Sequence, residues 1–133
     1  MFIALTLEAH PHRIRAAQWV DSLPERGILC FCRSTQQSYL RLLTVKEWMK
    51  EDVCTNDEAM NAYAKLTSDP RIQFAEEPPD LETQWLAYAR SAVPSPKRWM
   101  DAYLAAFARR ARMSIVTFDR GFLTFPDLDL IVL

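Results

Sequence analysis

Two aspartates in the stretch WMDAYLAAFARRARMSIVTFDRGF, residues 99–122, have the type and spacing of a metal site. Asp101 lies near the start of an expected helix, and Asp119 follows an expected buried strand. The helix rises roughly 15 Å from Asp101 to Ala111 at ~1.5 Å per residue. The strand then returns roughly 17 Å from Ser114 to Asp119 at ~3.3 Å per residue. A helix followed by an antiparallel strand would therefore leave both carboxylates at the same edge of a sheet.

Two carboxylates at one edge repel each other unless a proton or a cation lies between them. A hard, oxygen-seeking ion such as Mg²⁺ suits this place, because it needs only one or two protein carboxylates. Such a site fits metal-assisted hydrolysis of phosphodiesters. The alternative is that both are surface charges, with Asp101 placed for the helix dipole and Asp119 closing a turn. The residues alone leave both interpretations open.

The elements that must position these aspartates follow an alternating pattern of helices and strands. This alternation predicts an α/β fold with a parallel sheet. Apolar spacing and capping residues predict helices over residues 2–7, 13–23, 45–51, 57–69 and 81–93, a helix capped by Ser34 and Thr35, and a helix from Pro96 to Ala111 with Ser95 as its cap. Pro24 and Gly27 are expected to close the helix over 13–23. Short apolar runs predict strands over residues 28–32, 71–74, 114–118 and 128–133.

Composition limits the kind of protein. A chain of 133 residues is expected to form a single domain, 1–133, and its net charge of −1 excludes a globally basic nucleic-acid binder while leaving room for a local basic patch. With two glycines there is no glycine-rich phosphate loop, so a nucleotide cofactor is not expected. Cys30, Cys32 and Cys54 have no C-x-x-C spacing and fit a reducing cytoplasm. No run is long enough to span a membrane, and the first residues do not form a signal peptide.

The sequence resembles a known family over nearly its whole length. The segments SPKRWMDAYLAAFARRARMSIVTFDRGF and FPDLDLIVL, with LEAHPHRIRAAQWV and TQQSYLRLLT upstream, resemble PIN domains of the VapC toxin type. The most specific part is the pair D-A-Y-L-A-A and T-F-D-R. The resemblance implies a three-layer α/β/α PIN-like fold and a Mg²⁺- or Mn²⁺-dependent endoribonuclease. It also implies an RNA substrate, a small cognate antitoxin that neutralises the toxin, and a homodimer.

The family site takes acids from four places, and the resemblance carries over one position at a time. Asp101 matches the helix acid, Asp119 matches the acid after the late strand, and Thr117 matches the hydroxyl residue beside it. Gln36 stands where the family has its second acid, and it keeps a carbonyl oxygen but no charge. The first acid belongs to a D-x-N motif that would precede Met1. The chain is therefore expected to be an N-terminally incomplete copy that lacks the first central strand, which reading the upstream codons in frame would test.

Two functions follow from this site. The first is a toxin-type endoribonuclease of a toxin–antitoxin pair that hydrolyses RNA with Mg²⁺ held by Asp101 and Asp119. The second is a catalytically impaired PIN remnant that binds RNA or antitoxin without cleaving. The two retained acids favour the first function. The two missing acids favour the second, because the number of charged ligands sets the affinity for hard cations.

Other residues carry weaker signals. His10 and His12 are expected to form a structural loop pair, because Pro11 breaks any helical ligand spacing. Lys97 and Arg98 begin the helix of Asp101, where they would contact RNA phosphates or cover a solvated helix end. The cationic residues in the last turn of that helix are expected to interact favourably with the helix dipole: Arg109, Arg110 and Arg112. The four tryptophans are expected to be core or interface anchors: Trp19, Trp48, Trp85 and Trp99.

Overall fold

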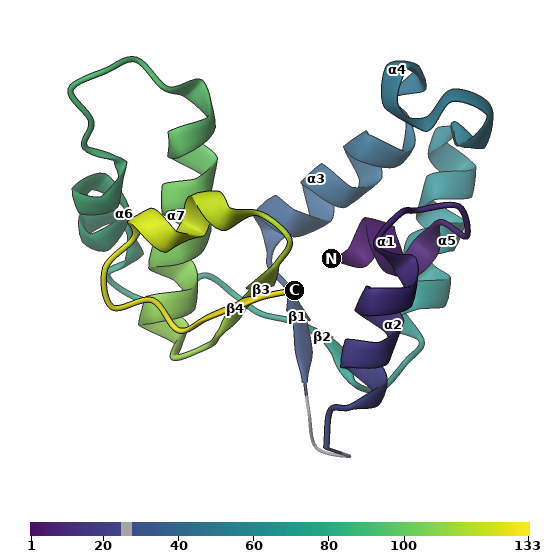
Figure 1. Cartoon of the computed structure of the whole chain (residues 1–133), viewed down its shortest axis with the longest axis horizontal. Helices are drawn as coiled ribbons and strands as arrows, with labels where there is room; N and C mark the ends of the chain where they lie inside the picture. The colour runs from purple at the N-terminus through teal and green to yellow at the C-terminus, as the bar shows by residue number, and fades with distance from the viewer. Residues whose placement is uncertain (25–27) are drawn as a thin grey trace. The chain divides into compact units, whose positions relative to one another are not determined.

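The computed structural model describes residues 1–24 and 28–133 and divides into two compact units, Met1–Glu76 and Glu77–Leu133. Each unit combines helices with one pair of parallel strands, so the predicted α/β class is confirmed (Figure 1). The expected parallel pairing is also observed, as β1 with β2 and β3 with β4. That residues 1–133 form a single domain stays a prediction. The helix-closing role of Gly27 falls outside the described residues.

The first unit holds most of the helices. Its elements in chain order are α1 (Phe2–Thr6), α2 (Arg13–Asp21), β1 (Leu29–Phe31), α3 (Arg33–Leu43), α4 (Lys46–Met49), η1 (Lys50–Asp52), α5 (Asn56–Thr67) and β2 (Ile72–Phe74). β1 and β2 run parallel with Leu29 opposite Ile72 and Phe31 opposite Phe74. The strands are shorter than the apolar runs that predicted them, because ladder pairing is confined to three residues on each strand.

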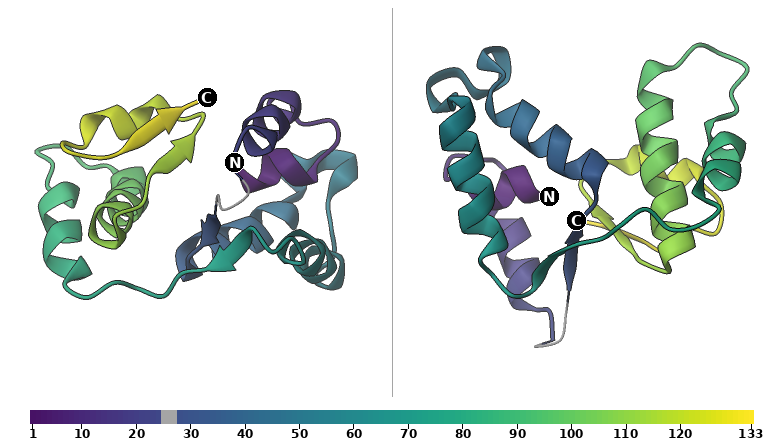
Figure 2. Two further views of the ribbon diagram at one scale, coloured as in Figure 1. Left: turned by 90° about the horizontal axis from the view of Figure 1, so that it is seen from below. Right: turned by 180° about the vertical axis from the view of Figure 1, so that it is seen from behind.

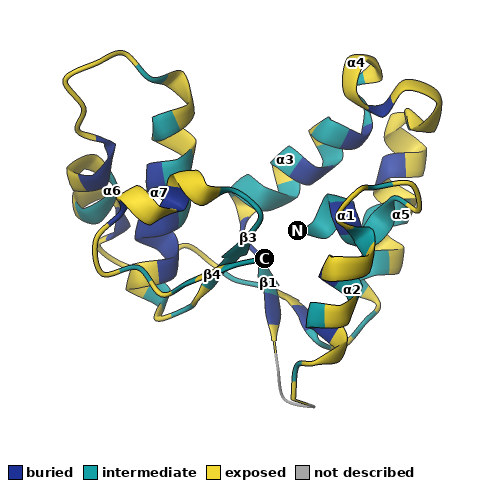
Figure 3. Cartoon of the chain, in the orientation of Figure 1, coloured by how far each residue is buried: buried dark blue, intermediate teal, exposed yellow. Residues whose placement is uncertain are grey.

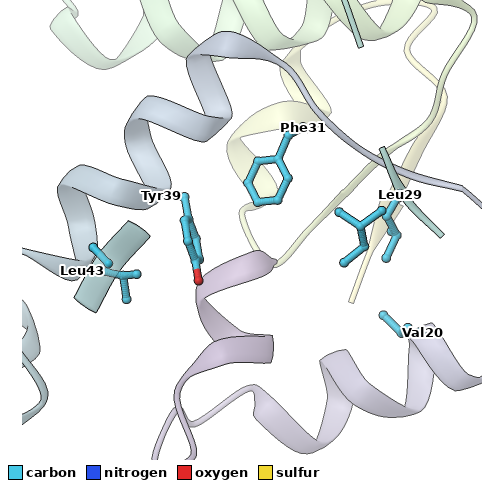
Figure 4. Close-up of a cluster of buried hydrophobic side chains, with 7 residues drawn as sticks. Val20, Leu29, Phe31, Tyr39 and Leu43 are labelled. Carbon is cyan, nitrogen blue, oxygen red and sulfur yellow. The ribbon is translucent and has the colours of Figure 1, made fainter. Parts of the chain in front are cut away.

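Phe31 is the centre of the first unit's core. Its side chain is fully buried, and the ring of Phe2 stacks on it at 3.7 Å between centroids. Tyr39 and Tyr63 present their edges to the same ring at 5.6 and 5.2 Å. Figure 4 shows Phe31 and Tyr39 among the buried side chains of this core. Leu43 is also fully buried. A strand of three residues is thus held by aromatic packing from α1, α3 and α5.

The start of α3 differs from its prediction. Ser34 and Thr35 were expected to cap α3, but the helix begins at Arg33 with Cys32 as its N-cap. The hydroxyl of Thr35 instead accepts a hydrogen bond of 2.9 Å from the backbone N–H of Cys32. Thr35 thus occupies the third helical position, from which it can reach back to the cap.

The second unit consists of α6 (Leu81–Ala89), α7 (Pro96–Ala111), β3 (Ile115–Thr117), η2 (Arg120–Thr124) and β4 (Leu130–Val132). α7 starts as predicted, with Ser95 at the N-cap and Pro96 at the first helical position. Its C-cap residue, Arg112, adopts the left-handed conformation with φ of 55°. The chain then turns into β3, which pairs in parallel with β4, and Figure 2 shows these two strands side by side.

Small side chains make α7 the core helix of this unit. Figure 3 shows its buried stretch in dark blue, and α6 packs against it. The buried residues of this helix are mostly alanines, namely Ala102, Ala105, Ala106 and Ala108 together with Phe107. Two hydrogen bonds then tie the neighbouring segments to one another. The hydroxyl of Tyr88 donates to the carbonyl of Pro126 at 2.7 Å, and the indole N–H of Trp85 donates to the carbonyl of Trp99 at 2.9 Å.

Two of the three arginines near the end of α7 form ion pairs. Arg109 pairs with Asp127 at 3.0 Å, and Arg110 pairs with Asp80 at 3.1 Å. These arginines were predicted to interact favourably with the helix dipole, and two of them also have specific carboxylate partners. Within the described ranges 1–24 and 28–133, no helix has both the length and the apolar character needed to cross a membrane.

Candidate metal-binding carboxylate pair

Asp101 lies in the second turn of α7, on the margin of its alanine-rich buried face. Its side chain is 18% exposed, whereas the neighbouring Ala102 and Ala105 are completely buried. A carboxylate with so little access to water is costly unless a partner compensates its charge. The helix therefore holds Asp101 at a place where a cation is favoured.

Asp119 is positioned by backbone contacts on both sides. It is the N-cap residue of η2, and its Oδ1 accepts a hydrogen bond of 2.8 Å from the backbone N–H of Gly121. The backbone N–H of Asp119 in turn donates to the hydroxyl of Thr117 at 3.0 Å. Thr117, the last residue of β3, thus orients the residue that carries the second carboxylate. Oδ2 of Asp119 contacts Lys97 instead.

Lys97 joins the two aspartates. Its Nζ lies 2.5 Å from Oδ2 of Asp119 and 3.4 Å from Oδ2 of Asp101. Because both oxygens contact the same nitrogen, they lie at most about 6 Å apart. The two carboxylates that the sequence spacing predicts to share an edge are therefore neighbours in the second unit, with a positive charge between them.

The pKa values of this group reflect the contact. The hydrogen bond from Lys97, followed by that from the backbone N–H of Gly121, lowers the pKa of Asp119 below its ordinary value. The hydrogen bond to Asp119 raises the pKa of Lys97, and the charge of Asp101 adds to it. Solvent screens a pair in which Lys97 is 64% exposed and Asp119 41% exposed. The ion pairs of Lys97 are therefore expected to add little to the stability of the fold.

A cavity of about 240 Å³ opens beside the pair. The guanidinium of Arg98 lies 5.1 Å from the centre of the Phe125 ring. Its buried Nε has no hydrogen-bond partner among the residues that the structure describes. The cavity is lined by Ser91, Val93, Ser95, Lys97, Arg98, Asp101, Gly121, Thr124 and Phe125.

Gly121 is a residue of the site that sequence reasoning missed. A Cβ at this position would lie 3.0 Å from Oδ1 of Asp119 and 3.5 Å from Nζ of Lys97. A side chain here would therefore crowd the carboxylate of Asp119 and lie in ordinary contact with the ammonium of Lys97. The signal was present in the sequence, because Gly121 is one of two glycines and follows Asp119 by two residues. Thr124 and Phe125 carried no comparable signal.

The remaining candidates lie in the first unit. Gln36 is on α3, where its side-chain oxygen accepts a hydrogen bond of 2.6 Å from Arg33. His10 and His12 lie in the loop before α2, and the backbone N–H of His12 donates to Nδ1 of His10 at 3.1 Å. Burial and the neighbouring His12 lower the pKa of His10. Within the described part of the chain, no group of three or more His, Cys, Asp or Glu side chains could hold a metal.

The donor set of the second unit fits a hard divalent cation. It offers two carboxylates at one place, already arranged around a positive charge. Mg²⁺ is commonly bound through one or two carboxylates and keeps waters or phosphate oxygens as its other ligands. Softer metals would require thiolate or imidazole ligands, and none lines the cavity.

Comparison with known proteins places the chain in a family. The model of the PIN domain matches residues 1–128. Ribonuclease VapC41 of Mycobacterium tuberculosis, in the strains CDC 1551 / Oshkosh and ATCC 25618 / H37Rv, is 42% identical over 134 residues, which cover 98% of this chain and 92% of the relative. The chain therefore belongs to the PIN-domain family and is a PIN domain of the VapC type. The resemblance inferred from D-A-Y-L-A-A and T-F-D-R is thereby confirmed.

Proposed function

We propose that the chain is a toxin-type endoribonuclease that hydrolyses RNA phosphodiester bonds with Mg²⁺ or Mn²⁺ held by Asp101 and Asp119. The observation that carries the proposal is the convergence of these two carboxylates on one cation position beside a cavity. The relative that is 42% identical is a ribonuclease by name, which supports the same activity. The helix and the strand end that hold the two acids are the parts of the sequence that most specifically resemble the family.

In this function the residues of the second unit bind and orient. Asp101 and Asp119 hold the ion, and Thr117 fixes Asp119 through the backbone contact described above. When bound, a hard divalent ion supplies an activated water and offsets negative charge on the phosphate. Arg98 lines the same cavity, where its guanidinium would donate to a phosphate oxygen. From the resemblance we add Gln36 to the catalytic set, as an uncharged oxygen donor.

A cleavage assay with the purified chain tests this proposal. RNA is incubated with the wild-type protein and with Asp101→Ala in the presence of Mg²⁺ or Mn²⁺. Asp57→Ala is the matched control, because Asp57 is also an aspartate in the early part of a helix, α5. We expect cleavage by the wild type and by Asp57→Ala, and its loss in Asp101→Ala. Equal cleavage by the wild type and Asp101→Ala would exclude the proposed site.

The second candidate function is a PIN remnant that binds RNA or antitoxin without cleaving. The scarcity of ligands favours it, because the described residues provide two carboxylates at the site and Gln36 is uncharged. A site with fewer charged ligands binds hard cations more weakly. The same assay separates the two candidates, since the remnant would cleave RNA with neither metal and would still retain RNA in a binding experiment.

We further propose the biological setting that belongs to a toxin of this type. The chain would be neutralised by a small cognate antitoxin, would form a homodimer and would act in the cytoplasm. We also propose the three-layer α/β/α arrangement that the family resemblance implies, which the parallel strands of both units support. A gene for a small protein next to the gene of this chain would support the antitoxin, and copurification of the two proteins would test it.

A further inference from the structure

Lys97 stands where one cation can neutralise both acids of the candidate site. It precedes Asp101 by four residues on α7, so the helix itself brings the ammonium next to that carboxylate. Asp119 arrives from the far end of β3, and its contact with Lys97 is the shorter of the two. The lysine thus connects two segments that are 18 positions apart in the sequence.

The ammonium and a divalent ion require the same oxygens. Oδ1 of Asp119 already accepts from Gly121, and Oδ2 is the atom that contacts Lys97. An ion that binds both aspartates through the oxygens that contact Lys97 must displace the ammonium or share them with it against the repulsion of like charges. Displacement disturbs no core packing, because the lysine is long, flexible and 64% exposed.

We propose that Lys97 is an internal counter-ion of the carboxylate pair, which holds Asp101 and Asp119 together without metal and yields its place when a divalent ion binds. The inference rests on the proposed function, because it takes the same two aspartates as metal ligands. Its consequence is that Lys97 lowers the affinity of the site for divalent ions while RNA is absent. The displaced ammonium stays beside the cavity, near Arg98, where a phosphate group of RNA would receive it.

A purely phosphate-binding lysine would behave differently. Such a residue would change the affinity for RNA and leave the binding of metal without RNA unchanged. An internal counter-ion changes metal binding in the absence of any RNA. The decisive measurement is therefore metal binding by the protein alone.

The test is a calorimetric titration of the full chain with Mn²⁺, without RNA. The variants are Lys97→Met, which removes the charge, and Lys97→Arg, which keeps it. Lys65→Met, on α5 in the first unit, controls for the change in net charge. We expect Lys97→Met to bind Mn²⁺ about tenfold more tightly than the wild type, since a competing positive charge a few ångströms away is gone. Lys97→Arg is expected to bind no more tightly than the wild type, and Lys65→Met to match it.

Thermal unfolding gives a second measurement on the same proteins. In EDTA, Lys97→Met is expected to unfold at a lower temperature than Lys65→Met, because its two acids face each other without compensation. Added Mn²⁺ should raise its unfolding temperature more than that of the wild type. Should Lys97→Met fail to fold, as judged by circular dichroism, Lys97→Gln replaces it in both measurements.

Asp101→Asn separates the inference from the proposed function. If Lys97→Met binds Mn²⁺ no more tightly than the wild type while Asp101→Asn loses binding, the role of Lys97 is wrong and the metal site stands. If Asp101→Asn binds as well as the wild type, or if no variant binds Mn²⁺, the metal site is wrong and the counter-ion role falls with it. Tighter binding by Lys97→Met together with loss in Asp101→Asn supports both.

Discussion

Thr117 contributes to the candidate site through one hydrogen bond between its side chain and the backbone of Asp119. Its hydroxyl accepts from the N–H of Asp119 and thereby fixes the start of the turn that carries the carboxylate. Residues of this kind do not touch a metal, but they determine where a ligand points. The family resemblance marked this position as a hydroxyl residue, and the structure gives a physical reason for the hydroxyl.

Replacing Thr117 by valine is the prediction that follows at this scale. Valine keeps the shape and the strand preference but leaves the N–H of Asp119 without its acceptor. We expect a loss of Mn²⁺ affinity of about tenfold, the size usual for residues that orient metal ligands. Mn²⁺ titration of Thr117→Val measures it, with Thr117→Ser as the control that keeps the hydroxyl. Unchanged affinity in Thr117→Val would show that Asp119 does not need this bond.

Lys97 shows what sequence reasoning can and cannot provide for single residues. The sequence placed it at the start of the helix of Asp101 and left it between a phosphate contact and a solvated helix end. The relation to Asp101 follows from helical spacing, so it was open to prediction. The contact with Asp119 depends on the angle at which β3 leaves the turn after α7, and no local pattern specifies that angle.

Among the elements, helices were predicted more accurately than strands. Pro96 and the alanine-rich face of α7 gave clear signals, and the helix has the predicted bounds. The run over residues 114–118 marked β3 correctly, but pairing shortens it to three residues. Apolar runs report burial, whereas strand ends are set by the partner strand. The pairing of β1 with β2 and β3 with β4 needed the structure for the same reason.

Helix α5 begins with a capping box, which makes its start testable. The hydroxyl of Thr55 accepts from the backbone N–H of Glu58 at 3.2 Å, and the carboxylate of Glu58 accepts from the N–H of Thr55 at 2.8 Å. We expect Thr55→Ala to reduce the free energy of unfolding by ~1 kcal/mol, as the loss of an N-cap usually does. Urea unfolding measures the change. Thr67→Ala, in the last turn of the same helix, is the control and is expected to leave stability nearly unchanged.

The same cap predicts a dependence of stability on pH. The hydrogen bond from the backbone N–H of Thr55, and then that from its side chain, lower the pKa of Glu58 in the folded chain. A carboxyl whose folded pKa is lowered stabilises the protein above its unfolded pKa, about 4.3 for Glu. That contribution is lost as the pH falls through the lowered value. Comparing urea midpoints of the wild type and Glu58→Gln between about pH 6 and 3 tests it. We expect the difference between the two proteins to shrink toward low pH, and a constant difference would contradict the assignment.

At the scale of the whole molecule, the assignment to the family was reached from the sequence alone. Two short motifs, D-A-Y-L-A-A and T-F-D-R, carried it, and the match to the PIN domain over residues 1–128 confirmed it. The division into two compact units was not foreseen, because apolar periodicity describes each helix and strand separately. The site at Asp101 and Asp119 was accessible to prediction because both residues belong to one consecutive helix and strand. Gln36 is different, since its role depends on the family resemblance and on a part of the chain far away in sequence.

The role proposed for Gln36 leads to a prediction about the complete chain. If Gln36 stands in the place of a family acid, then Gln36→Glu restores a charged ligand. The affinity for Mn²⁺ is then expected to rise by about tenfold, because ligand charge sets the affinity for hard cations. Gln37→Glu is the matched control: it makes the same chemical change one position along α3, where the helix turns the side chain by about 100°. Equal gains in both variants would indicate a general effect of net charge. No gain in Gln36→Glu, with binding still dependent on Asp101, would remove Gln36 from the site and leave the two aspartates as its only proposed metal ligands.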